Sequence, residues 1–323
     1  MQVLITAFPF GTGKSSLERL QAAGIKYQLT PFKRRLTEQE LIALIPSASI
    51  LIAGTEPITA KAMEAASELR LIARVGIGLD NVDLETARKR GITVTYTPDA
   101  PAPAVAELTI GLMIDLLRHV SRADRLMHSK EWKRLLGRRL DGLTIGVVGV
   151  GRVGKRVIRI LKGGFPGVRI LANDIQPDHS FGKQFEVAWT EKPELFAAAD
   201  VITLHLPLTR LTRRLIAERE IHTMKPSASI INTSRGEIID EEALAKNLAD
   251  GRIAGAAIDV FEHEPYSGVL SGIEQCILTC HMGSMSEDCR AAMESEAVDD
   301  VLRFVRGEPL GQPVPEAEYE NCK

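Results

Sequence analysis

Three residues near the end of the chain, Arg235, Glu264 and His281, have the chemistry of an anion clamp and a proton relay. Each follows a short apolar run that predicts a β-strand. The three runs are residues 229–232, 253–259 and 276–280. Because ligands of doubly wound sheets bind outside the carboxyl ends of the strands, these side chains are expected to converge there. An arginine that binds a carboxylate and a Glu–His pair that moves a proton suit the interconversion of an alcohol and a ketone.

Each of these residues also has a simpler structural interpretation. Arg235 could form a surface ion pair, Glu264 could carry a charge at a helix end, and His281 could be an ordinary loop histidine. Glu262 and His263 are alternatives to Glu264 and His281 within the same part of the sequence. The occurrence of three reactive residues at successive strand ends favours a site.

A glycine-rich turn supplies the second part of the chemistry. The stretch from Gly149 to Gly154 reads G-x-G-x-x-G, follows the strand-like run Leu143–Val148 and opens a helix-like segment. In this context the pattern is the dinucleotide-binding fingerprint. Gly149 permits the tight turn, Gly151 lets the backbone approach a pyrophosphate, and Gly154 lets the helix pack closely on its strand.

An acidic residue after the next strand selects between the two nicotinamide cofactors. Asp174 lies about 20 residues after Gly154, where a carboxylate accepts hydrogen bonds from the adenosine ribose. Its charge would repel a 2′-phosphate, and the following Ile175 and Gln176 provide no arginine to bind one. The sequence therefore predicts NAD rather than NADP.

A second candidate phosphate-binding motif, near the N-terminus, is incomplete. Gly13, Lys14 and Ser15 resemble the end of a P-loop, but the first glycine of that motif is replaced by Phe8. Pro9 also removes one backbone N–H from the cradle. We interpret this region as a strand over 2–7 that turns into a helix.

Strand and helix signals alternate in two series, which predicts an α/β protein with two doubly wound parallel-sheet domains. The proline-rich stretch 97–107 separates the series and is interpreted as a hinge, followed by a helix from Val105. The last helix, over 288–305, is expected to return to the first domain. The predicted domains are residues 1–98 plus 286–323 and residues 99–285.

The composition excludes several other classes of protein. The 323 residues are 45% hydrophobic with a net charge of −2, so neither nucleic acid nor membrane is an expected partner. The basic segment 118–139 is interpreted as a solvated helix face rather than a nucleic-acid patch. No signal-peptide pattern and no C-x-x-C spacing occur, so we expect a cytoplasmic protein with reduced cysteines and no metal site.

Long stretches of the chain resemble the D-isomer-specific 2-hydroxyacid dehydrogenase family, in its phosphoglycerate dehydrogenase-like group. The matching stretches include LRLIARVGIGLDNVDL, GVVGVGRVGKRV, LHLPLTRLT, INTSRGEIIDEEAL, GAAIDVFEHEP and LTCHMGS, and the resemblance extends from about Ile50 to Gly307. It implies a flavodoxin-like substrate domain, a Rossmann domain that binds NAD(H), a homodimer formed through that domain, and a small 2-hydroxy or 2-keto acid as substrate.

The resemblance also implies roles for individual residues. Arg235 would bind the substrate carboxylate and polarise its carbonyl group, His281 would donate and accept the proton, and Glu264, rather than Glu262, would hold the imidazole. Asp259 would bind the nicotinamide carboxamide. Further residues at the cofactor would be Arg152, Val153, Leu206, Pro207, Thr212, Thr233 and Gly283. The backbone of Val75, Gly76 and Ile77 would bind the substrate carboxylate.

The chain departs from the family pattern in three places. Cys280 replaces the proline that usually precedes the histidine, the stretch 53–56 lacks the arginine of phosphate-binding relatives, and the stretch 99–107 lacks an asparagine common in serine-pathway enzymes. The leading hypothesis is therefore an NAD-dependent dehydrogenase of a small D-2-hydroxy acid. The alternatives are D-3-phosphoglycerate dehydrogenase and, from a different class, an NADH-sensing scaffold or corepressor.

Overall fold

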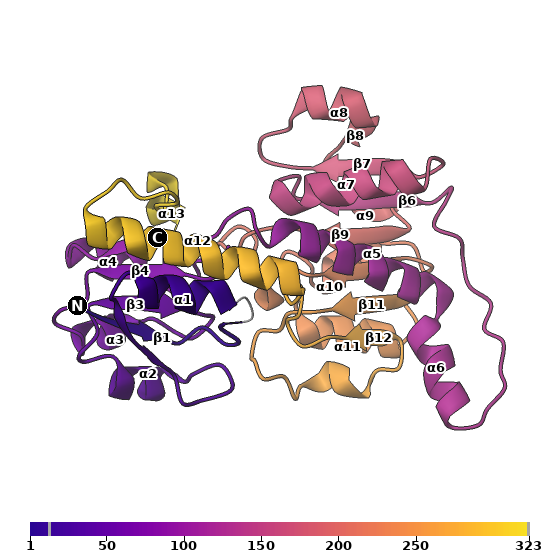
Figure 1. Ribbon diagram of the computed structural model, residues 1–323. Helices are drawn as coiled ribbons and strands as arrows, with labels where there is room; N and C mark the ends of the chain where they lie inside the picture. The colour runs from indigo at the N-terminus through magenta and orange to yellow at the C-terminus, as the bar shows by residue number, and fades with distance from the viewer. Residues whose placement is uncertain (12–13, 322–323) are drawn as a thin grey trace. The chain divides into compact units, whose positions relative to one another are not determined.

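The computed structural model describes residues 1–11 and 14–321, and divides the chain into two compact units (Figure 1). One unit comprises Met1–Pro101 and Ser284–Lys323, and the other comprises Ala102–Gly283. The division lies within three residues of the expected boundaries at 98 and 285. Gly13, part of the rejected P-loop pattern, lies outside the described residues.

The first unit contains a five-stranded parallel sheet in the order β2-β1-β3-β4-β5. Its strands are β1 (Gln2–Ile5), β2 (Lys26–Leu29), β3 (Ile50–Ala53), β4 (Leu71–Arg74) and β5 (Thr93–Thr95). Its helices are α1 (Lys14–Ala22), α2 (Glu38–Leu44), α3 (Ala60–Glu64), α4 (Leu84–Lys89), α12 (Glu287–Arg306) and α13 (Glu316–Asn321). Every residue of β3 and β4 is buried, as expected for central strands covered on both faces. Helix α12 packs against α1 and β4.

The second unit contains a seven-stranded parallel sheet in the order β12-β11-β10-β9-β6-β7-β8. Its strands are β6 (Thr144–Val148), β7 (Arg169–Asn173), β8 (Val187–Trp189), β9 (Val201–Leu204), β10 (Ser229–Asn232), β11 (Gly255–Ile258) and β12 (Cys276–Leu278). Its helices are α5 (Ala102–Arg118), α6 (Val120–His128), α7 (Arg152–Gly164), α8 (His179–Phe185), α9 (Lys192–Ala198), α10 (Glu218–Thr223) and α11 (Glu241–Ala249). Two parallel α/β sheets confirm the predicted fold class.

Two sequence-based expectations about the second unit are wrong. Helix α5 begins at Ala102 rather than Val105, because the first turn of a helix tolerates Pro103, whose missing N–H would have no partner there. The basic segment 118–139 is not one helix face. Arg118 ends α5, residues 120–128 form α6, of which no residue is buried, and residues 131–139 have no regular structure.

The helices of the second unit cover a sheet that is buried at its centre. Helices α5 and α7 pack against each other (Figure 1), and every residue of β6, β9, β10 and β11 is buried. None of the helices in the described parts of the chain is both long and apolar enough to cross a membrane.

Candidate functional site

The glycine-rich turn connects β6 to α7 at the point where the strand order of the second sheet reverses. Gly149 has a φ of 90°, and a Cβ atom there would collide with the backbone carbonyl of His205. A Cβ atom at Gly154 would collide with the carbonyl oxygen of Gly149. These two positions therefore require glycine because backbone segments approach each other closely.

Gly151 differs from its two neighbours because a Cβ atom there would have no other atom within 4 Å. It caps the N-terminus of α7, whose first turn contains no acidic residue. A helix N-terminus attracts anions, so this open space suits a pyrophosphate. Arg152 is exposed at the first position of α7, and Val153 is half-buried beside it.

Asp174 lies directly after β7 and faces the same turn. Its Oδ2 accepts a hydrogen bond of 2.7 Å from the backbone N–H of Val150, and its Oδ1 accepts one of 2.9 Å from Gln176. The carboxylate is thus fixed at the end of the strand, beside the N-terminus of α7. This position fits the ribose-binding acid of a dinucleotide site.

The loop after β9 lies against the glycine-rich turn. Thr212 Oγ1 donates a hydrogen bond of 2.7 Å to the carbonyl oxygen of Pro207 and accepts one of 2.8 Å from Thr209 N–H. Leu206 is half-buried. A methyl group at Gly149 would lie 3.0 Å from the Leu206 side chain, so this loop touches the glycine-rich turn.

His205, in the same loop, was not singled out from the sequence. Its Nε2 lies 3.0 Å from Thr203 Oγ1, while its Nδ1 is buried with no hydrogen-bond partner among the described residues. Burial lowers the pKa of this imidazole to about 3, so it is neutral at physiological pH. The stretch LHLPLT contains it, but its burial depends on the packing of the turn and could not be read from that stretch.

The turn after β10 presents Arg235. Asn232 shapes this turn because its Nδ2 donates to the carbonyl oxygen of Arg235 (2.8 Å) and its Oδ1 accepts from Ser234 N–H (3.0 Å). Thr233 Oγ1 lies 2.9 Å from Thr109 Oγ1 of α5. A Cβ atom at Gly236 would collide with the backbone of residue 261, so the turns after β10 and β11 are in direct contact.

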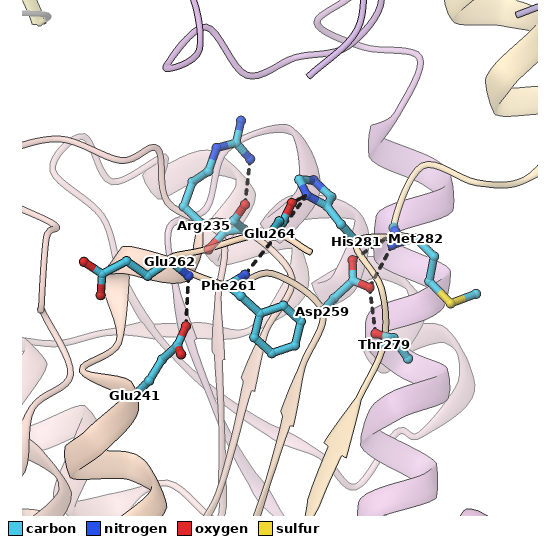
Figure 2. A network of polar contacts seen from close by, with 11 residues as sticks. Arg235, Glu241, Asp259, Phe261, Glu262, Glu264, Thr279, His281 and Met282 are labelled. Atoms are coloured by element: carbon cyan, nitrogen blue, oxygen red, sulfur yellow. Dashed lines mark hydrogen bonds and ion pairs between the residues drawn. The ribbon is translucent and has the colours of Figure 1, made fainter. Parts of the chain in front are cut away.

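Glu264 and His281 form a close pair at the ends of β11 and β12 (Figure 2). The imidazole Nδ1 lies 2.8 Å from Glu264 Oε2 and 3.1 Å from Oε1. Glu264 Oε1 also accepts a hydrogen bond of 3.1 Å from Phe261 N–H, which holds the carboxylate in place. Figure 2 shows Arg235 on the same side of the sheet edge as this pair.

The rival residues do not take part in this pair. Glu262 and His263 are both exposed, and in Figure 2 the Glu262 side chain points away from His281. The backbone N–H of Glu262 instead donates a hydrogen bond of 2.9 Å to Glu241 Oε1. The geometry therefore favours Glu264 and His281 over their neighbours.

Asp259, which is 1% exposed, holds the loop that presents His281. Its carboxylate accepts hydrogen bonds from Thr279 Oγ1 (2.6 Å), Met282 N–H (2.9 Å) and Gly283 N–H (3.0 Å). Its carbonyl oxygen accepts one of 2.7 Å from His281 N–H. These contacts support a left-handed backbone at His281, whose φ is 52°. These contacts join Asp259 to the neighbouring loop, after β12, and the expected binding of the nicotinamide carboxamide by Asp259 stays a prediction.

The predicted substrate loop, residues 75–77, belongs to the first unit. Val75 N–H donates a hydrogen bond of 2.9 Å to Ala53, and Gly76 N–H donates one of 2.8 Å to Thr97 Oγ1. Two of the three amides expected to bind substrate are therefore used within the unit. Ile77 is half-buried at the same turn.

The residues of the second unit fit a bound dinucleotide. Three features lie around one turn: the open space at Gly151, the N-terminus of α7, whose first turn contains no acidic residue, and the Nδ1 of His205, which has no hydrogen-bond partner among the described residues. Asp174 lies at the adjacent strand end. Arg235, Glu264 and His281 follow strands further along the same sheet, where a nicotinamide ring would meet them.

Comparisons with known proteins identify the family of the chain. The family model "D-isomer specific 2-hydroxyacid dehydrogenase, NAD binding domain" matches residues 110–283. A glyoxylate reductase of Korarchaeum cryptofilum is 38% identical over 79% of this chain and 78% of that protein. A D-3-phosphoglycerate dehydrogenase of Methanocaldococcus jannaschii is also 38% identical, over 84% of this chain, but the chain spans only 53% of its length.

Solved structures of other proteins share the fold of this chain. The apo-structure of D-lactate dehydrogenase from Escherichia coli superposes with a TM-score of 0.84 and 27% identity, and covers 98% of this chain and 100% of that one. The fold, the grouping of Arg235, Glu264 and His281, and these relatives lead to one conclusion. The chain belongs to the family of D-isomer specific 2-hydroxyacid dehydrogenases and is an oxidoreductase.

Proposed function

We propose that this protein transfers a hydride between NAD(H) and C2 of a small D-2-hydroxy acid or the corresponding 2-keto acid. The observation that carries the proposal is the His281–Glu264 pair, which lies at the carboxyl edge of a sheet that also bears a dinucleotide-binding turn. Such a pair has no evident structural purpose at a half-exposed edge, whereas carbonyl reduction needs a positioned proton donor.

The proton is assigned to His281 Nε2. Nδ1 faces Glu264, so the other ring nitrogen is the one available to a substrate. During reduction negative charge develops on the carbonyl oxygen, and an imidazolium beside it stabilises that charge and then donates the proton. Glu264 orients the ring and stabilises its positive charge. A bound reduced nicotinamide supplies the hydride.

Arg235 is assigned to the substrate carboxylate. Its guanidinium group presents several donors in one plane, which matches a carboxylate in two parallel hydrogen bonds. Residues 232–236 fix the backbone from which it extends. Val75, Gly76 and Ile77 are assigned to the same carboxylate from the first unit, with Ile77 N–H as the principal donor because the other two amides already donate within that unit.

NAD(H) is the proposed cofactor rather than NADP(H). The fixed carboxylate of Asp174 would repel a 2′-phosphate, and Ile175 and Gln176 offer no positive charge. Fluorescence titration of the wild-type protein is expected to show much tighter binding of NADH than of NADPH. Asp174→Ser is expected to reduce this difference, and equal affinities of the wild-type protein for both cofactors would contradict the assignment.

A homodimer formed through the second unit is also proposed. Trp132 and Leu136, in the segment after α6, are 83% and 96% exposed, and Met127 is 52% exposed. Large apolar side chains grouped in one segment are typical of a contact surface. Light scattering of Trp132→Asp/Leu136→Asp is expected to show monomers, whereas the control Val269→Asp stays dimeric. A monomeric wild-type protein would contradict the proposal.

Turnover of a substrate panel tests the main proposal. NADH absorbance is followed with glyoxylate, pyruvate, hydroxypyruvate and 3-phosphohydroxypyruvate. Reduction of the unphosphorylated acids supports the proposed activity, and reduction of only the phosphorylated acid would identify a D-3-phosphoglycerate dehydrogenase. Tight NADH binding without turnover of any acid would instead support the sensor alternative.

A further inference from the structure

The segment between β11 and β12 carries Glu264, and most residues of the stretch 262–269 are exposed. A carboxylate that orients an imidazole needs a fixed backbone, because its effect depends on its distance from the ring. We propose that Glu241, at the start of α11, is a positioning residue for the reaction, and that it acts by fixing the backbone that presents Glu264. This inference rests on the proposed function and deepens it.

Glu241 extends from a fixed point at the start of a helix. It is the first residue of α11, which is capped by Asp240, whose Oδ1 accepts a hydrogen bond of 3.1 Å from Ala243 N–H. Glu241 Oε1 accepts a hydrogen bond of 2.9 Å from Glu262 N–H, drawn as a dashed line in Figure 2. Because the acceptor is ionised, this bond is stronger than one between neutral groups.

The amide held by Glu241 follows directly on the amide that holds Glu264. Phe261 N–H donates a hydrogen bond of 3.1 Å to Glu264 Oε1, and the next N–H, that of Glu262, donates to Glu241. Two successive backbone N–H groups are thus bound by two carboxylates, and only the two backbone dihedrals of Phe261 lie between them. If the second amide turned away, the first would lose its fixed direction, and the Glu264 carboxylate would lose its fixed position.

The turn after β10 confines the same peptide from another side. A Cβ atom at Gly236 would collide with the backbone of residues 261–262, so this peptide lies directly against the turn. The turn is held by hydrogen bonds of its own. Loss of the Glu241 contact should therefore displace Glu264 and leave Arg235 in place.

An aromatic pair fixes the far end of the stretch that contains Glu264. The ring centroids of Phe261 and Tyr266 are 3.9 Å apart and the rings are 19° from parallel. The Tyr266 hydroxyl accepts a hydrogen bond of 2.9 Å from Leu270 N–H. Burial raises the pKa of this hydroxyl, and the charge of the nearby Glu241 carboxylate raises it further. Glu241 therefore lies near both ends of the stretch 261–266.

The Glu241 contact should matter more for position than for stability. Glu262 is exposed, so water can bind its N–H when the carboxylate is withdrawn, and little free energy of unfolding is lost. A displaced Glu264, in contrast, no longer orients His281, and a misplacement of about 1 Å at a reacting group can cost roughly 100-fold in rate. We therefore expect a loss of kcat without a loss of stability.

Two conservative substitutions separate the reach of the side chain from its charge. Glu241→Asp keeps the negative charge, which suits the first turn of a helix, but its carboxylate is one methylene too short to reach Glu262 N–H. Glu241→Gln loses the charge but keeps an acceptor oxygen at the same reach. With the best keto acid of the substrate panel, Glu241→Asp is expected to lower kcat roughly 10-fold and to change KM less than about 3-fold. Glu241→Gln should restore kcat to near the wild-type value.

Further variants exclude a general structural effect. Glu242→Asp makes the same change at the next residue of α11, which is exposed, and should leave kcat and KM unchanged. The unfolding temperatures of all these variants should stay close to that of the wild-type protein. In Glu264→Ala no carboxylate remains to be positioned, so adding Glu241→Asp should cause no further loss of kcat.

A spectroscopic measurement makes the test independent of turnover. In protein with isotope-labelled histidine, the NMR signal of the His281 ring is the one that His281→Gln lacks. This signal should shift in Glu241→Asp, because the carboxylate beside the ring moves. It should keep its wild-type position in Glu241→Gln and in Glu242→Asp.

The outcomes distinguish this inference from the proposed function. A wild-type kcat and an unshifted His281 signal in Glu241→Asp, or equal losses in Glu241→Asp and Glu241→Gln, would overturn the role of Glu241, while turnover by the wild-type protein upholds the proposed function. A Glu241→Asp variant that does not fold would also overturn it, since the contact would then be structural. If no keto acid is turned over, the proposed function fails, and the His281 signal alone decides whether Glu241 fixes the Glu264–His281 pair.

Discussion

His281 and Glu264 face each other across two strand ends, with the imidazole Nδ1 2.8 Å from the carboxylate Oε2. Glu264 follows β11 and His281 follows β12, so only the pairing of these strands makes them neighbours. Phe261 N–H holds the carboxylate in turn. This arrangement leaves Nε2 of His281 for the substrate and indicates that Glu264 acts through the imidazole.

The first prediction is that Glu264 contributes to catalysis only through His281. His281→Gln is expected to lower kcat by about 10²–10⁴-fold, the usual contribution of a positioned acid–base group. Glu264→Gln should lower kcat by a smaller factor, because the imidazole remains but loses its orienting charge. The double variant should be no worse than His281→Gln alone, since residues that act as a unit are not additive. Steady-state kinetics of all three variants measure this.

The neighbouring residues provide matched controls for that experiment. Glu262→Gln and His263→Gln change the same residue types at exposed positions in the same segment. Both should retain near-wild-type turnover. Fully additive losses in the double variant, or a large loss in His263→Gln, would show that the pair does not carry the proton.

The second prediction separates substrate binding from cofactor binding. Arg235→Ala is expected to reduce kcat/KM by the equivalent of about 2–5 kcal/mol, because the substrate carboxylate loses its charged partner. Affinity for NADH, measured by fluorescence titration, should stay almost unchanged. Arg219→Ala, at a 91% exposed side chain of α10, is the control. An Arg235 variant with normal kcat/KM would remove this residue from the site.

The third prediction uses three glycines of the same turn and helix. Gly154→Ala should destabilise the protein by roughly 1–3 kcal/mol, since the added methyl group collides with the Gly149 carbonyl. Gly151→Ala should leave the unfolding temperature unchanged but weaken NADH binding, because its methyl group would occupy the space assigned to the pyrophosphate. Gly163→Ala, inside α7 with no atom nearby, should affect neither property adversely.

Calorimetry and cofactor titration decide this third prediction together. Its distinctive feature is that a loss of stability at Gly154 and a loss of cofactor binding at Gly151 are separated within one turn of helix. If Gly151→Ala binds NADH as tightly as the wild-type protein, the cofactor does not approach the N-terminus of α7 as proposed.

Local patterns were sufficient to predict much of the fold. The strand over Ser229–Asn232 was predicted with the bounds it has in the structure, because a short apolar run ends in polar residues there. Helix α5 begins three residues early because Pro103 fits its first turn. Strand β8, of only three residues, was not predicted, because its sequence Val-Ala-Trp has little periodicity and its pairing with β7 defines it.

The site was predictable in its residue types but not in its contacts. The sequence placed Arg235, Glu264 and His281 at strand ends, yet could not choose between Glu264 and Glu262 without the family resemblance. The contacts of Asp259 with residues 279–283 depend on the pairing of β11 with β12. The burial of His205 Nδ1 likewise arises from packing between segments that are distant in sequence.

The last prediction concerns His205 and the dependence of stability on pH. Burial lowers the pKa of its imidazole from 6.5 to about 3 in the folded protein. Below pH 6.5 the unfolded chain therefore binds a proton that the folded protein does not, and the free energy of unfolding falls with decreasing pH. The free energy of unfolding is expected to fall by about 1 kcal/mol for each pH unit below 6.5. Above that pH the imidazole is neutral in both states, and no stability is lost through it. Denaturant unfolding of the wild-type protein and of His205→Asn between pH 6.5 and pH 4.5 measures it.

The informative quantity in that experiment is the slope rather than the stability at one pH. His205→Asn removes the titrating group while keeping a polar side chain beside Thr203, so its stability should depend less steeply on pH in this range. His222→Asn, at an exposed side chain of α10, should retain the wild-type slope. Parallel slopes in the wild-type protein and His205→Asn would mean that water reaches the imidazole in solution. The Nδ1 of His205 would then not be a buried atom that lacks a hydrogen-bond partner until cofactor binds.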